Sequence, residues 1–167
     1  MKLMNLTAMK KVHFLILTSI LVFALTEISN AQRLSDQKKV LIEQQIDSVF
    51  QASVKVAEQI DYNELSKGVD DRHNAGFIVN RSYYPQYKLL IEKLKEIQPE
   101  GARQSISVDT KKITVLSEKI ALLTASGTAK GELGSGQTFN AGFLWSFVYE
   151  KIDNKWKVIQ SHQSSTR

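Results

Sequence analysis

The hydrophobic period of this chain changes near residue 101. Before that point apolar residues recur every three or four positions, and after it they alternate with polar ones. The first pattern is typical of amphipathic helices and the second of strands with one buried face. The order therefore predicts helices followed by an antiparallel meander, an α+β fold with the helices packed on one face of the sheet.

Three helices are expected in the first part of the chain. The longest covers about residues 40–60, and its buried stripe is predicted to be Ile42, Ile46, Val49, Phe50, Ala57 and Ile60. A short second helix starts after Asp61, with Glu64 three residues later, and ends at Gly68. A third helix opens near Pro85 and buries Tyr87, Leu90, Ile91, Leu94 and Ile97.

Five strands are expected in the second part, at about 104–109, 112–117, 119–131, 138–151 and 155–165. Asp109-Thr110-Lys111 is interpreted as the turn between the first two strands. Asp153-Asn154-Lys155 joins the last two as a hairpin. No repeat, low-complexity segment or linker interrupts residues 36–165, so we expect one domain.

The N-terminal 31 residues have the pattern of a signal peptide. Three lysines precede an apolar run of about 12 residues from Phe14 to Leu25, which is shorter than the ~20 residues of a membrane span. Ser29-Asn30-Ala31 supplies small residues at a cleavage site, so we expect a signal peptide of 1–31 and a mature domain of 32–167. The protein would be exported, periplasmic or secreted, without stable membrane insertion. An uncleaved anchor is the alternative.

Composition excludes several chemistries. The chain has no cysteine, so disulfides, thiolate nucleophiles and cysteine-ligated metals are excluded. Its net charge of +5 is mild and its lysines are scattered among acids, so we expect no nucleic-acid partner.

The last strand points to a pocket wall. The run after the hairpin turn alternates, so Trp156, Val158, Gln160, His162 and Ser164 share one face, with an aromatic at one end and an imidazole beside a hydroxyl at the other. On the preceding strand Phe143, Trp145, Phe147 and Tyr149 share a face. Core or dimer packing is the alternative explanation for these aromatics.

The run from Ser146 to Ser164, SFVYEKIDNKWKVIQSHQS, resembles the SnoaL-like branch of the nuclear transport factor 2 superfamily. The resemblance covers about residues 36–165. It implies a cone, in which a curved, mostly antiparallel sheet wraps the long first helix around a cavity. It also implies a homodimer through the outer sheet face. Because this fold hosts isomerases, cyclases, hydrolases, dehydratases and non-catalytic binders, the resemblance alone does not choose among them.

The predicted ligand-binding residues are Tyr62, Phe77, Tyr87, Trp145, Trp156, His162 and Ser164. The resemblance places the first three at the cavity rim, and His162 is the best catalytic candidate. Asp70, Asp71 and His73 have no metal-site spacing relative to His162, and a solvated loop explains them more simply. We expect no metal and no cofactor.

Three functions remain open at this point. The first is a non-catalytic module that holds a small apolar or amphipathic ligand in the cone. The second is a proton-transfer enzyme of the isomerase, cyclase or hydrolase type, using His162 with Tyr62 or Asp61 on a polyketide- or steroid-like substrate. The third is a homodimerisation module with a vestigial pocket.

Overall fold

The computed structural model describes residues 34–97, 101–133 and 136–166. The chain divides into two units, Met1–Ser35 and Asp36–Arg167, and every described helix and strand belongs to the second. The predicted signal peptide lies outside the described residues. No described helix combines the length and apolar character that a membrane crossing requires.

Three helices form where the apolar spacing predicts them. α2 (Asp36–Glu58) buries a four-residue repeat consisting of Ile42, Ile46, Phe50 and Val54. α3 (Tyr62–Lys67) begins after Asp61, whose side chain accepts a hydrogen bond from the Glu64 N–H at 2.9 Å. Gly68 ends α3 by donating its N–H to the Leu65 carbonyl. α4 (Tyr87–Ile97) buries Leu90 and Ile91.

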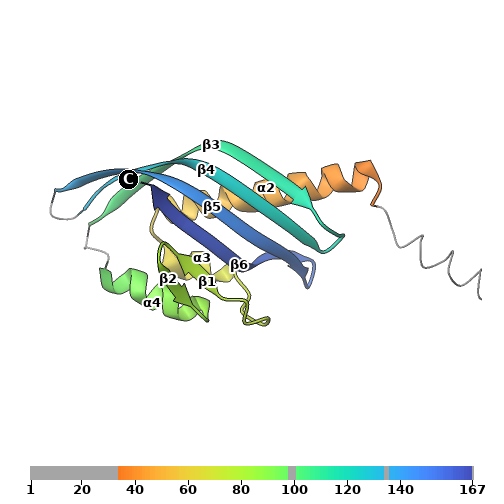
Figure 1. Cartoon of the computed structure of the whole chain (residues 1–167), viewed down its shortest axis with the longest axis horizontal. Helices are drawn as coiled ribbons and strands as arrows, with labels where there is room; N and C mark the ends of the chain where they lie inside the picture. Colours follow the sequence, from red (N-terminus) through yellow and green to blue (C-terminus); the bar gives the residue numbers. More distant parts are fainter. Residues whose placement is uncertain (1–33, 98–100, 134–135, 167) are drawn as a thin grey trace, which may run out of the picture. The chain divides into compact units, whose positions relative to one another are not determined.

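The strands form one curved sheet (Figure 1), confirming the predicted α+β class with a mostly antiparallel sheet. Its order is β2-β1-β6-β5-β4-β3. The two short strands are β1 (Phe77–Val79) and β2 (Ser82–Tyr84). The four long ones are β3 (Arg103–Val115), β4 (Ile120–Glu132), β5 (Thr138–Ile152) and β6 (Lys155–Thr166). Only the β1–β6 pairing is parallel among the described strands.

The predicted turn at Asp109-Thr110-Lys111 is wrong, because β3 runs through it as one strand. Val108 pairs with Gly127 and Thr110 with Ser126, so Asp109 is the extra residue of a β-bulge. The bulge moves the inward-facing positions from even to odd numbers, which keeps Val108 and Ile113 facing the helices. A polar residue that suits a turn also suits a bulge.

Gly127 of β4, the partner of Val108 beside this bulge, leaves no room for a side chain. A Cβ added there would lie 2.0 Å from the Ser107 carbonyl oxygen and 2.6 Å from the Phe143 ring. Only glycine fits this position.

A second bulge, in β6, decides which side chains face the interior. Tyr149 pairs with Val158 but Val148 pairs with Gln160, which leaves Ile159 as the extra residue. The hairpin turn before it is as predicted, with Asp153 at φ 48° and Asn154 at φ 61°, the left-handed values of a tight β-hairpin turn. Trp156 and Val158 therefore face inward with Ser161 and Gln163. Gln160, His162 and Ser164 face the opposite, outer side of the sheet.

Candidate functional site

An aromatic row on β5 forms the inner wall of the sheet. Its members are Phe143, Trp145, Phe147 and Tyr149, as predicted. Phe143 stacks on Trp145 with ring centroids 3.8 Å apart, and Phe147 meets the edge of Trp145 at 6.0 Å. Phe143 and Tyr149 are only 4% and 1% exposed, whereas Trp145 and Phe147 are half-buried. The middle of the wall is thus less completely covered than its ends.

Polar side chains of β6 lie next to these two half-buried rings. Gln163 is the cross-strand partner of Trp145, and Ser161 is the partner of Phe147. The Gln163 amide donates to the Ser161 hydroxyl at 3.2 Å. Within the described residues the indole N–H of Trp145 has no hydrogen-bond acceptor, although tryptophan N–H groups usually find a partner. Apolar area and available polar groups therefore occur together here.

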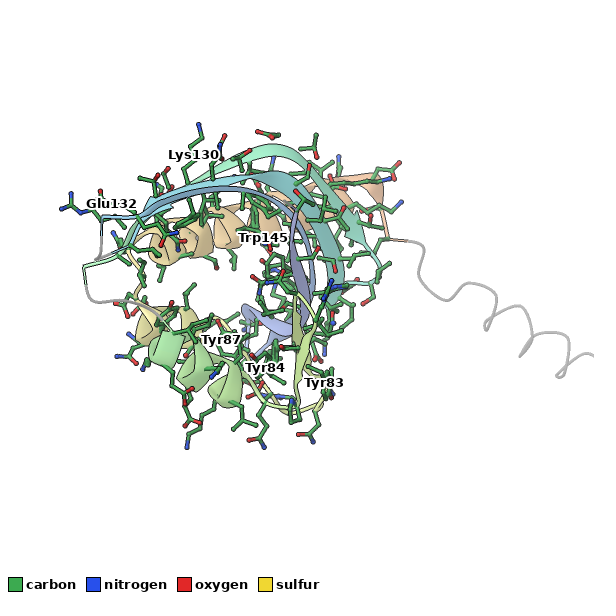
Figure 2. The ribbon with its side chains drawn as sticks, turned by 60° about the vertical axis from the view of Figure 1, so that its left-hand side comes forward. Tyr83, Tyr84, Tyr87, Lys130, Glu132 and Trp145 are labelled. Atoms are coloured by element: carbon green, nitrogen blue, oxygen red, sulfur yellow. The ribbon has the colours of Figure 1, made fainter. Side chains whose placement is uncertain are left out.

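Phe77 and Tyr87 continue this surface across the parallel strand pair. Phe77 is the Cα partner of Ser161, and its ring meets the Tyr87 ring edge-on at 5.0 Å. Figure 2 shows Trp145 on the inner side of the curved sheet and Tyr87 on α4. We call Phe77, Tyr87, Trp145, Phe147, Ser161 and Gln163 the inner site.

The surroundings of the Tyr87 phenol raise its pKa. Burial, and then the charges of Asp71 and Tyr62, raise the pKa of Tyr87 to about 12. Burial alone raises the pKa of Tyr62 and that of Tyr149 on the inner wall. These phenols are therefore hydrogen-bond donors at neutral pH and not bases.

Asp71 fixes the start of α4 and carries an unusual oxygen. Its Oδ2 accepts the backbone N–H of Tyr87 at 2.9 Å, which caps the helix. Its Oδ1 is the one buried side-chain polar atom in the described part of the chain without a hydrogen-bond partner. Asp71 is also one of the residues that line a cavity of about 370 Å³ between α3 and α4. Buried polar atoms nearly always have a hydrogen-bond partner, so Asp71 Oδ1 is available to accept a hydrogen bond.

The predicted shared face of Trp156, His162 and Ser164 is wrong, because the Ile159 bulge separates them. Trp156 faces inward, where it is buried and donates its indole N–H to Gln45 Oε1 of α2 at 2.9 Å. His162 is paired with Ser146 and exposed on the outer face, and Ser164 donates to the Leu144 carbonyl there at 3.3 Å. Both line an outer hollow of about 570 Å³.

The remaining predicted residues lie partly on the inner side of the sheet and partly at α3. Phe77, Tyr87 and Trp145 lie on the inner side, with Tyr62 close enough to Tyr87 to influence its pKa. Asp61 is occupied with capping α3. His162 therefore does not form a single site with Tyr62 and Asp61.

Side chains of the polar loop 70–76 contact one another and Glu150 of β5. Arg72 pairs with Asp70 at 2.9 Å, which holds the Asp70 pKa below its usual value, and His73 Nε2 contacts Glu150 Oε2 at 2.5 Å. The described residues contain no cluster of histidine, cysteine or acidic side chains arranged for a metal ion.

Sequence reasoning missed Ser161, Gln163 and Phe147 as site residues. Strict alternation from Trp156 places the first two on the outside, and only the bulge returns them inward. A usable signal was the alternation within β5, since the partners of its aromatic row on β6 necessarily share their face.

The raised Tyr87 pKa predicts a loss of stability at high pH. The unfolded phenol has a pKa of 10.0 and the folded one about 12, so this contribution is complete below pH 10 and is lost as pH rises through 12. Relative to Tyr87→Phe, the free energy of unfolding of the wild type should fall by about 2–3 kcal/mol over that window. Denaturant titrations at stepped pH measure it. If the free energy of unfolding changes equally with pH in the wild type and Tyr87→Phe, the raised pKa of Tyr87 is contradicted.

Neither a scan against known protein families nor a comparison with curated proteins finds a match for this sequence. The fold does match solved structures. A nuclear transport factor 2-like superfamily protein from Salmonella enterica aligns with a TM-score of 0.67 and 17% identity, over 77% of this chain and 94% of that one. The chain has the nuclear transport factor 2-like fold. The predicted cone fold is thereby confirmed.

Two further matching structures are a domain and a subunit of other proteins. The association domain of CaMKII from C. elegans aligns with a TM-score of 0.62 and 14% identity, covering 79% of this chain and all 100% of that one. The β subunit of benzoate 1,2-dioxygenase from Burkholderia mallei aligns with a TM-score of 0.61 and 8% identity, over 72% and 88%. At these identities the likeness concerns the fold.

Proposed function

We propose that this protein binds a small apolar or amphipathic molecule at the inner site, without transforming it. The observation that carries the proposal is the incomplete cover of Trp145 and Phe147 on the inner wall, where their row neighbours are buried. Ligand sites are mostly apolar with a few placed polar groups, and the Gln163 side chain and the free Trp145 N–H supply those groups here.

The chemistry of the inner face supports binding over catalysis. Among the inward-facing residues of β3–β6 in the described ranges, none is a carboxylate or an imidazole. Lys111, which is one of them, is paired with Asp47 of α2. The neutral phenol of Tyr87 donates and does not abstract a proton at pH 7. The inward face of these strands therefore offers stacking and hydrogen bonds, and in the described ranges it carries no carboxylate or imidazole to act as a base.

The test is native mass spectrometry of the protein purified from its own cells, beside Trp145→Ala. We expect a bound small molecule on the wild type and at least about ten-fold weaker retention by the variant, because tryptophan supplies the largest apolar contact. His162→Ala is the matched control and should retain the molecule. Loss from the His162 variant with retention by the Trp145 variant would overturn the proposal.

We infer that two copies associate through the outer sheet face. Leu144 is 54% exposed on that face beside the outer hollow, and two fold neighbours are components of assemblies. Leu144→Asp should shift a dimer toward monomer in analytical ultracentrifugation. A wild type that sediments as a monomer would refute this.

We also propose export with cleavage after Ala31, on the pattern of the first 31 residues. The mass of the mature protein from the native source should correspond to a chain beginning at Gln32. A native protein that still carries residues 1–31 would favour the uncleaved N-terminal anchor.

A further inference from the structure

A groove between α2, α3 and the β5–β6 hairpin has no role in the inner site. Its volume is about 570 Å³, within the range of ligand-binding cavities, and none of the inner-site residues lines it. We call it the basic groove.

One wall of the basic groove is a second stripe of α2. Val49, Ala52, Ser53 and Val56 follow one another at three- and four-residue spacing, beside the stripe that packs on the sheet. Ala52 is exposed and Val49 and Val56 are only half-buried, so no other element of the described structure covers this stripe completely. Trp156 lines the groove as well.

The rim of the groove is strongly cationic. Four lysines line it, Lys67, Lys151, Lys155 and Lys157, against one acid, Glu64. Glu64 is paired with Lys67 at 2.5 Å, so it compensates none of the other three.

Two of those three lysines already have contacts that fix them at the groove. Lys157 donates to the carbonyl of Lys67, and Lys151 Nζ lies 5.8 Å from the ring centroid of Trp156. The side chain of Lys155 makes no hydrogen bond or ion pair within the described structure. The apolar stripe of the groove therefore lies beside three positive charges, and the Lys155 side chain is the one without a partner in the described structure.

We propose that the basic groove binds a fatty acid, with the carboxylate at Lys155 and the hydrocarbon chain along the Val49–Val56 stripe. Charge complementarity requires an anion, and the half-covered stripe requires an apolar body attached to it. An acidic amphipathic helix has the same chemistry, but two turns of a helix 10–12 Å across occupy roughly 1,000 Å³, more than the groove holds. The proposal adds a second site to the one at the inner wall.

Isothermal titration calorimetry with dodecanoate below its micelle concentration tests this on the full mature domain. Dodecyltrimethylammonium, with the same chain and the opposite charge, is the charge control. Dodecanoate should bind and the cation should not. Lys155→Glu should weaken dodecanoate binding about ten-fold, as expected for losing one charge-assisted hydrogen bond.

Two further variants locate the binding. Ala52→Phe fills the groove from an exposed helix position and should abolish binding without loss of the fold, which circular dichroism checks. Lys112→Glu makes the same charge change on an exposed strand residue that does not line the groove, and should leave the affinity within about two-fold. Trp145→Ala should bind dodecanoate normally, which separates this site from the inner site.

The proposal is overturned if dodecanoate gives no binding heat, or if both amphiphiles bind equally. It is also overturned if Lys112→Glu weakens binding as much as Lys155→Glu, or if Trp145→Ala abolishes binding while Ala52→Phe does not.

Discussion

Replacing Phe50 with alanine should lower the free energy of unfolding by about 3–5 kcal/mol. Phe50 is 2% exposed, its ring centroid lies 6.1 Å from that of Phe147, and Lys111 Nζ lies 5.8 Å from it. The substitution removes the central contact between α2 and the inner wall, and the cavity left behind cannot close against a sheet held by long strands. Urea denaturation followed by circular dichroism measures the change.

Gln51→Ala is the matched control for Phe50→Ala, because Gln51 is the neighbouring residue of α2 and is exposed. It should change stability by less than about 0.5 kcal/mol. If both variants unfold at the wild-type denaturant concentration, the helix does not pack on the sheet through Phe50.

Deleting Ile159 should largely abolish folding. Without the extra residue, the segment before it shifts by one position against β5, and Trp156 turns from α2 toward solvent. Losing a buried tryptophan and its hydrogen bond to Gln45 costs about 3–5 kcal/mol, a large part of the 5–15 kcal/mol that stabilises a typical domain. The near-ultraviolet circular dichroism of the aromatic cluster reports the loss.

Ile159→Ala keeps the residue count and hence the bulge, so it controls for the side chain alone. It should retain the wild-type spectrum and lose less stability than the deletion, because Ile159 is only half-buried. A deletion variant as stable as Ile159→Ala would show that the bulge does not set the strand register.

The helices and the hairpin turn followed from the sequence because local patterns determine them. Asp61 and Gly68 end α3 through hydrogen bonds within a few residues. Asp153 and Asn154 adopt left-handed backbone values with little strain. The aromatic row of β5 followed from unbroken alternation in a single strand.

The two bulges did not follow from the sequence, and the errors about the site come from them. Asp109 was interpreted as a turn residue, and Ile159 carries no signal distinguishing it from any other strand residue. A bulge is chosen by which register buries the most apolar surface across several strands, a property of the assembled sheet. Strict alternation predicts His162 and Ser164 on the inner face. Because Ile159 is an extra residue, Ser161 and Gln163 lie there instead.

The most direct test of the inner site is a crystal structure of the protein purified from its native source. The account predicts extra density against the Trp145 ring on the inner side of the sheet, within hydrogen-bond distance of its indole N–H or of the Gln163 side chain. Density bound instead at His162 on the outer face, or a Trp145 ring fully covered by the protein's own side chains, would contradict it.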